Sequence, residues 1–289
     1  MLSGSLLLAI TSGLVAIALV YLRGWLCVRN AFQSLIPAWR LAAFISGLVS
    51  VWAAAASPLA ALDHQSLTIH MVKHLLLMTV AAPLILAGAP VFPLVCGLPK
   101  LFIKNHRSLA SVPPRWLEPC LRYPVWGWFA GTAAVIGWHL PVAFQLGMRS
   151  HGMHVLEDVS FLVAGLMFWF PIVQSAPSTP RLPRWSMALY LFFATLPCDI
   201  LSEFLVFCNR LVYPFYLSTP HLFSMPPLED QECAGALMWV WVTFACLIPA
   251  VAITVQILSP SNMKSQEPIQ AAPQSVAGRS HNGAEAEVL

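Results

Sequence analysis

The chain has 289 residues, of which 58% are hydrophobic and only 9% are charged, with a formal net charge of +3 at pH 7. A soluble domain usually carries about 25% charged residues. This composition excludes an ordinary soluble protein and indicates that lipid surrounds most of the chain. The sequence also has no phosphate loop, no nucleophile elbow and no H-E-x-x-H motif, so we expect neither a typical enzyme nor a nucleic-acid-binding protein.

Seven segments are long and apolar enough to cross the roughly 30 Å of a bilayer's hydrocarbon core. We expect helices, because in lipid every backbone polar group must be satisfied within the protein. The first span has no basic residue ahead of it, which favours a retained anchor over a cleaved signal. The predicted spans are Leu6–Leu22, Leu41–Ala56, Thr68–Ala87, Val125–Leu146, Leu156–Val173, Ser186–Phe207 and Gly235–Leu258.

The sequence therefore predicts an all-α fold, a polytopic membrane helix bundle of about seven transmembrane helices over residues 1–258. Residues 259–289 are rich in Ser, Gln, Ala and Glu, a composition typical of a disordered tail. All but three of the 15 basic residues fall in the first, third and fifth connections and in this tail. By the positive-inside rule, the N-terminus is predicted to lie outside and the C-terminal tail in the cytoplasm.

The third span opens with the polar stretch HMVKHLLLM, residues 70–78. Residues three or four apart share one face of a helix, so His70, His74 and Met78 are predicted to form one stripe, with Met71 at its edge. We expect Lys73 to point partly away and to extend toward the outer surface. On the predicted topology this stripe lies at the outer membrane face.

Other polar side chains are predicted at the same face. His139 ends the fourth span, and His154 lies one turn from Asp158, next to Glu157. Asp199 and Glu203 have the same spacing in the sixth span, and they could instead pair with Lys73 in a purely structural role. His64 and His221 lie in loops, where we interpret them as ordinary hydrogen-bonded residues. The acids predicted to support ligating imidazoles are Glu157, Asp158, Asp199, Glu203 and Asp230.

Three kinds of chemistry fit imidazole and thioether groups with carboxylates nearby. Soft thioethers together with imidazoles suit copper, in particular the cuprous ion, and carboxylates can orient the ligating imidazoles. A helix bundle can also hold haem through axial histidines. Alternatively, a chain of His, Asp and Glu can relay protons.

Three blocks of the sequence resemble the CtaG-type cytochrome c oxidase assembly factors, a multi-span bacterial family. The blocks are HMVKHLLLMTVAAPLILAGAP, WHLPVAFQLGMRSHGMHVLEDVSFLVAGLMFWFPIV, and LVYPFY followed by PLEDQECAGALMWV. The resemblance covers about residues 69–255. It implies a multi-pass protein of the bacterial plasma membrane that is needed to form active haem–copper oxidase. The family's recurrent polar positions map onto His70, His74, His139, His154, Glu157, Asp230 and Gln231.

Together, these observations predict a membrane assembly factor that holds or passes copper and turns over no substrate. The predicted metal ligands are His70, His74 and Met78, with His139 or His154. The expected partners are oxidase subunits or other assembly factors. The alternatives are a haem-binding redox membrane protein and a metal-free structural scaffold.

Overall fold

The computed structural model describes residues 4–31, 37–98, 123–173, 183–219 and 225–259. Within these ranges every regular element is a helix. The elements are α1 (Gly4–Ala31), α2 (Ala38–Ala55), η1 (Pro58–Leu62), α3 (Leu67–Leu75), η2 (Leu76–Ala81), α4 (Ala82–Ala87), α5 (Val91–Gly97), α8 (Pro124–His139), α9 (Pro141–Arg149), α10 (His151–Val173), α11 (Arg184–Phe207), η4 (Pro214–Ser218) and α12 (Pro227–Leu258).

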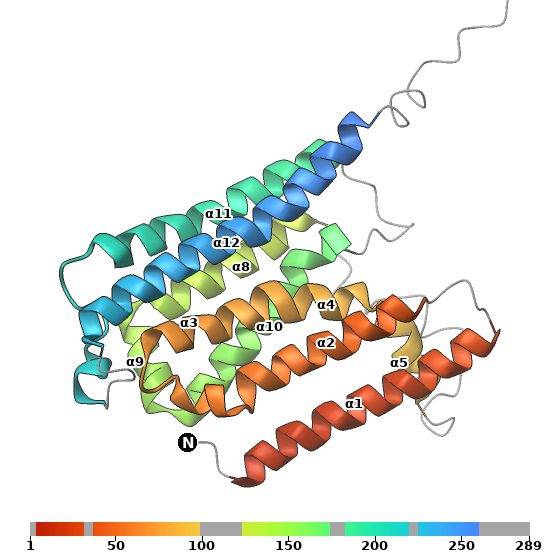
Figure 1. Ribbon diagram of the computed structural model, residues 1–289, viewed down its shortest axis with the longest axis horizontal. Coiled ribbons are helices and arrows are strands. Elements are labelled where there is room, and N and C mark those ends of the chain that lie inside the picture. Colours follow the sequence, from red (N-terminus) through yellow and green to blue (C-terminus); the bar gives the residue numbers. More distant parts are fainter. Residues whose placement is uncertain (1–3, 32–36, 99–122, 174–182, 220–224, 260–289) are drawn as a thin grey trace, which may run out of the picture.

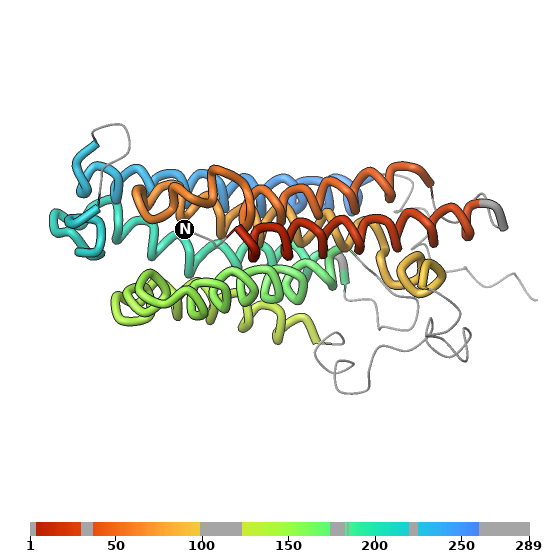
Figure 2. The backbone as a smooth tube through the Cα atoms, turned by 90° about the horizontal axis from the view of Figure 1, so that it is seen from below, coloured from red at the N-terminus to blue at the C-terminus, as the bar shows by residue number. Residues whose placement is uncertain are grey.

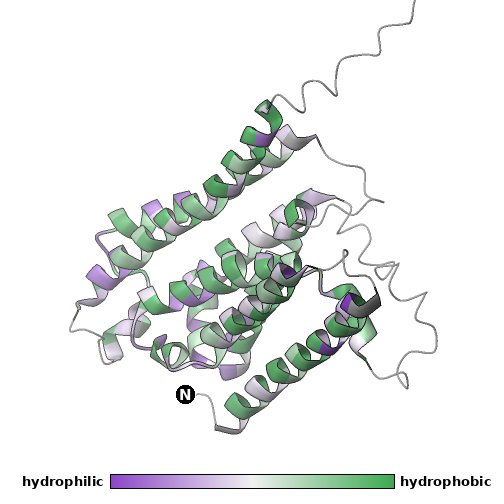
Figure 3. Cartoon of the chain, turned by 45° about the vertical axis from the view of Figure 1, so that its right-hand side comes forward, coloured by the Kyte–Doolittle hydropathy of each residue, from purple (hydrophilic) through white to green (hydrophobic). Residues whose placement is uncertain are grey.

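Six helical segments of the described chain are long and apolar enough to cross a membrane, and a bent pair of helices brings the number to as many as seven. The helices run side by side, with α1 along one edge and the α11–α12 pair along the other (Figures 1 and 2). Apolar residues colour most of the helix surfaces in Figure 3, and large hydrophobic side chains such as Ile200 and Val240 are exposed. The predicted all-α membrane bundle is therefore confirmed.

The prediction of one continuous helix for the fourth span is wrong. Instead of one helix over Val125–Leu146, the chain forms α8 and α9, which meet at an angle of 77°. Proline disfavours helical geometry in the residue before it, and Leu140, which precedes Pro141, has extended backbone angles (φ −62°, ψ 131°). The break turns α9 across the end of the bundle that also holds the start of α3 (Figure 1).

The third span is built from α3, a π-helical turn η2 and α4. A π-helical turn bonds i to i+5 and shifts the face that later residues present. It also leaves the Met78 carbonyl available to accept a hydrogen bond from Trp169 Nε1 at 3.0 Å. Gly165 of α10 packs on the same turn, and a Cβ at this glycine would lie 2.8 Å from the Met78 carbonyl oxygen. The π-helical turn is thus held in close contact with α10.

Some predictions fall outside the described residues. These are the tail from residue 260 onward, most of the basic connection between the third and fourth spans, and His221.

Candidate metal centre

Helices α3 and α10 bring most of the predicted polar residues together. Helix α3 starts at the N-cap Ser66, whose hydroxyl accepts a hydrogen bond from the Ile69 N–H. Asp230, at the start of α12, reinforces this cap, because its carboxylate accepts hydrogen bonds from Leu67 N at 2.6 Å and Thr68 N at 3.2 Å. The capping fixes the first turn of α3, which carries His70 at its end.

His70, His74 and Glu157 form a buried group that we call the histidine–glutamate centre. The two Nε2 atoms lie 2.9 Å apart. Glu157 Oε1 lies 3.4 Å from Nε2 of His70 and 3.3 Å from Nε2 of His74. All three residues are buried, and one ligand atom from each could reach a common ion. The rings are fixed by aromatic neighbours, with Phe144 edge-on to His70 and Phe161 stacked on His74.

Hydrogen bonds within this centre do not give every imidazole nitrogen a partner. A single proton can join the two Nε2 atoms, since one must donate and the other accept. Within the described residues, Nδ1 of His70 and Nδ1 of His74 have no hydrogen-bond partner. Buried polar atoms without partners are uncommon and costly. A metal ion bound by both Nε2 atoms would place a proton on each Nδ1, and Asp158 Oδ1 lies 3.8 Å from Nδ1 of His74 to attract it.

The spacing of the centre is slightly tighter than a bound ion requires. Two nitrogens on one tetrahedral ion, each about 2.0–2.1 Å from the metal, lie roughly 3.3 Å apart. The two imidazoles, now 2.9 Å apart, would have to separate by a few tenths of an ångström.

Beside this centre lies a second group, the lysine network of Asp63, Lys73, His154 and Asp158. Lys73 Nζ lies 2.6 Å from Asp63 Oδ2 and 3.4 Å from Asp158 Oδ2. His154 Nε2 lies 2.8 Å from the same Asp63 oxygen and 2.9 Å from Lys73 Nζ. Lys73 is only 2% exposed, so the prediction that it extends to the outer surface is wrong. The acids that pair with Lys73 are Asp63 and Asp158, and not Asp199 and Glu203.

His154 joins the two groups, because its Nδ1 lies 3.4 Å from Glu157 Oε2. Asp63, His64 and His154 also have a geometry that could hold an ion. Lys73 Nζ, however, already contacts both Asp63 and His154, so the chain places its own permanent cation there. The histidine–glutamate centre has no lysine or arginine among its described contacts, and the ion-pair partners of Glu157 are histidines.

The charges of the two groups do not balance. Asp63, Glu157 and Asp158 contribute three carboxylates, and Lys73 contributes one ammonium group. Burial alone would raise the pKa of Asp63, but hydrogen bonds from His154 and Lys73 hold that pKa well below its usual range. Unpaired buried charge is costly, so the cluster attracts additional positive charge in the form of protons or a cation.

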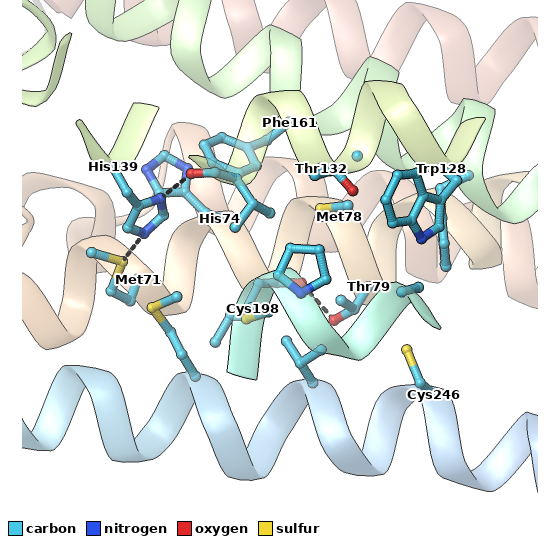
Figure 4. Close-up of a pocket in the computed structure, with 18 of the residues that line it drawn as sticks. Met71, His74, Met78, Thr79, Trp128, Thr132, His139, Phe161, Cys198 and Cys246 are labelled. Carbon is cyan, nitrogen blue, oxygen red and sulfur yellow. Dashed lines mark hydrogen bonds between the residues drawn. The ribbon is translucent and has the colours of Figure 1, made fainter. Parts of the chain in front are cut away.

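His139 and the methionines occupy a neighbouring apolar pocket (Figure 4). His139 Nδ1 lies 2.6 Å from the Val135 carbonyl oxygen, and its Nε2 lies 3.2 Å from the sulfur of Met71. Met78 lies in the π-helical turn, with its terminal methyl next to Gly131 of α8. Met71, which was predicted only for the edge of the stripe, is therefore the methionine whose sulfur contacts an imidazole.

The remaining predicted acids have other positions. Asp230 caps α3 and makes its hydrogen bonds with Ser66, Leu67 and Thr68, so it supports the imidazoles only through the helix that carries them. Asp199 is half-buried on α11 and Glu203 is exposed there. His64, interpreted as an ordinary loop residue, lies 3.8 Å from the Asp63 carboxylate, and burial lowers its pKa.

Three residues that position these groups were missed in the sequence. Asp63 precedes the third span in a short loop, and its ten-residue separation from Lys73 matches no helical period. Tyr216 donates a hydrogen bond to the Asp63 carbonyl, and Tyr213 donates one to the His139 carbonyl. Both tyrosines belong to the LVYPFY block, so the signal available in the sequence was their place in a family motif.

The family assignment follows from comparison with known proteins. A family model described as cytochrome c oxidase caa3 assembly factor (Caa3_CtaG) matches residues 19–259. An uncharacterized protein of Mycobacterium leprae is 24% identical over 256 residues, which cover 84% of this chain and 37% of that protein. Uncharacterized proteins of Mycobacterium bovis and Mycobacterium tuberculosis are each 24% identical over 251 residues, with the same coverage.

This chain thus spans 37% of the length of these curated relatives. No solved structure matches it. The family match includes the whole of α3, α8, α9 and α10. These helices carry the histidine–glutamate centre, His139 and every residue of the lysine network except Asp63. Asp63 precedes α3 and lies within the match as well. The chain belongs to the cytochrome c oxidase caa3 assembly factor family.

Proposed function

We propose that this protein binds copper at the histidine–glutamate centre and passes it to cytochrome c oxidase during assembly. One observation carries the proposal: two imidazole Nε2 atoms and one carboxylate oxygen converge within 3.4 Å of one another in a buried site. Imidazole is a preferred ligand of copper, and a family that assembles a haem–copper oxidase gives copper a destination.

The charge of the site supports a cation as its ligand. With neutral imidazoles, the two groups together hold two more negative than positive charges. A bound copper ion offsets this excess where it is most concentrated, at Glu157. It also allows both Nδ1 atoms of the ligating histidines to carry protons, one of them facing Asp158. Carboxylates in that position are typical supports for ligating imidazoles.

The proposed copper site also has an expected side of the membrane. We infer that the centre faces the outer side of a bacterial plasma membrane, because the distribution of Lys and Arg in the sequence favours an outward N-terminus. Helix α3 would then present His70 and His74 near the outer surface, on the side from which copper and an oxidase subunit could approach.

The test is metal binding by purified full-length protein in detergent. Copper titration of the wild type should show an ion that the His70→Ala/His74→Ala double variant does not bind. His151→Ala is the matched control, since His151 starts α10 but is exposed and belongs to neither buried group. Equal binding by the double variant and the wild type would contradict the proposal.

The same preparation separates the alternative functions. A Soret band in the visible spectrum that is lost in His74→Ala would indicate a haem protein in place of a copper protein. A metal-free scaffold predicts that the double variant still supports the assembly of active oxidase in cells that lack the native gene. The copper function predicts instead an assembled oxidase that lacks copper, measured by metal analysis of the purified enzyme.

A further inference from the structure

Met71 and His139 contact each other at the edge of an apolar pocket, which His74 of the histidine–glutamate centre also lines. Met71 comes from α3 and is 1% exposed, and His139 ends α8 and is 8% exposed. Their Sδ and Nε2 atoms lie 3.2 Å apart (Figure 4). Because Met71 follows His70 directly, α3 presents an imidazole to Glu157 and a thioether to His139 from adjacent residues.

The proton on His139 is assigned by its other nitrogen. The Val135 carbonyl oxygen, 2.6 Å from Nδ1, can only accept a hydrogen bond, so Nδ1 must carry the proton. In the neutral imidazole, Nε2 is then a bare lone pair. Its neighbour is the sulfur of a thioether, which has no proton to donate. Two lone-pair atoms therefore face each other in a buried site with no hydrogen between them.

A soft cation bound to both atoms would satisfy their lone pairs, and the two atoms, now 3.2 Å apart, would have to separate to hold it between them. Thioether and imidazole together favour the cuprous ion over harder divalent ions. The adjoining pocket has a space of about 70 Å³ into which an ion can be received. Other sulfur-bearing side chains line the same pocket, namely Met78, Met238, Cys198 and Cys246.

We propose that Met71 and His139 form a second metal site that is selective for a cuprous ion and separate from the histidine–glutamate centre. The two sites differ in kind, since one contains a carboxylate and the other a thioether. The proposal rests on the proposed function only for the choice of copper as the physiological ion. Helix α3 contributes ligands to both proposed sites.

The experiment is a cuprous titration of the full-length protein in detergent under anaerobic conditions, followed by X-ray absorption at the copper edge. The wild type should bind two cuprous ions, with sulfur among the ligands of one. Met71→Leu keeps nearly the same volume and should lose one ion together with the sulfur signal. His139→Asn retains an N–H for the Val135 carbonyl but lacks Nε2, and it should lose the same ion.

Met148→Leu is the matched control, because Met148 is a buried methionine of the same core cluster but does not line the pocket. It should bind two ions with the sulfur signal intact. A wild-type spectrum without sulfur ligands, or equal spectra for Met71→Leu and Met148→Leu, would overturn the proposal.

The His70→Ala/His74→Ala variant separates this proposal from the proposed function. It should retain the sulfur-ligated ion. If this double variant binds as many ions as the wild type while Met71→Leu loses one, the histidine–glutamate centre fails and the thioether site stands. If the double variant also loses the sulfur-ligated ion, the residues form a single site and the separate site is refuted.

Discussion

The histidine–glutamate centre and the lysine network occupy the same two helices but balance their charges differently. In the lysine network, the Lys73 ammonium lies between Asp63 and Asp158, so the chain supplies its own cation. In the centre, the ion pairs of Glu157 among the described residues are all with histidines, which are charged only when protonated. The comparison indicates that one half of the cluster contains a permanent cation, whereas the charge balance of the other half depends on protonated histidines or on an added cation.

Replacing the internal cation should have the largest effect. Lys73→Met removes the ammonium group from the buried Asp63 and the partly buried Asp158, and breaking such a pair typically costs about 3–5 kcal/mol. We expect the free energy of unfolding in detergent to fall by that amount. The exposed Arg149 of α9 provides the control, since Arg149→Met should change stability by less than about 0.5 kcal/mol.

The Lys73→Met variant also tests whether the lysine network can bind a metal ion once its own cation has been removed. Without Lys73, Asp63, His64 and His154 retain the geometry of a metal site. Lys73→Met should therefore bind one more zinc ion than the wild type, and zinc should restore part of its lost stability. A Lys73→Met protein as stable as the wild type would show that the ammonium group does not hold the network together.

Removing the cap of α3 should disturb both groups at once. Asp230→Ala leaves the N–H groups of Leu67 and Thr68 without an acceptor, which costs about 1–3 kcal/mol for each buried donor. Asp230→Asn keeps one acceptor oxygen and should fall between the alanine variant and the wild type. Thermal unfolding measures both, and metal titration of the same samples should show weaker binding in the same order.

Removing the charge of Glu157 tests the histidine–glutamate centre in the same way that Lys73→Met tests the lysine network. Glu157→Gln removes a buried carboxylate whose ion-pair partners are all histidines, so the metal-free protein should lose less stability than Lys73→Met does. Its copper affinity should fall by about 10–100-fold, the range found when carboxylates that support a metal site are lost. Unchanged affinity would show that the carboxylate is not part of the binding site.

The smallest effect should be a pH dependence carried by Asp63. Its pKa is lower in the folded protein than its usual value of about 3.9. The stabilisation is therefore complete above the usual pKa and is lost as the pH falls through the folded pKa. Between pH 7 and about pH 5 the contribution of Asp63 to the melting temperature of the wild type should stay constant. Below about pH 4 it should fall more steeply than that of Asp63→Asn.

Hydropathy was sufficient to predict the helical membrane fold, because a span needs only an apolar run of adequate length. The break at Pro141 was visible in the sequence, but its consequence was not. Proline can kink a helix slightly or end it, and the 77° turn depends on what α9 packs against.

Helical spacing predicted the pairing of His70 with His74, because four residues apart is a local relation. His74 and Met78 line the same pocket, although Met78 lies within the π-helical turn. Helical spacing failed for Lys73, whose partner Asp63 is brought near by the loop before α3. Contacts between segments such as Asp230 and the start of α3 follow from tertiary packing, and no local period indicates them.

The turn at Pro141 has a kinetic consequence for any ion in the histidine–glutamate centre. It lays α9 over the centre, with Phe144 5.2 Å from the His70 ring and Gly147 so close to Glu157 that a Cβ would lie 2.8 Å from its carboxylate. An ion bound in the proposed centre would therefore be covered on that side by α9, and we expect its exchange to require a movement of α9. If a partner displaced α9 on docking, release would become faster, as the proposed delivery of copper requires.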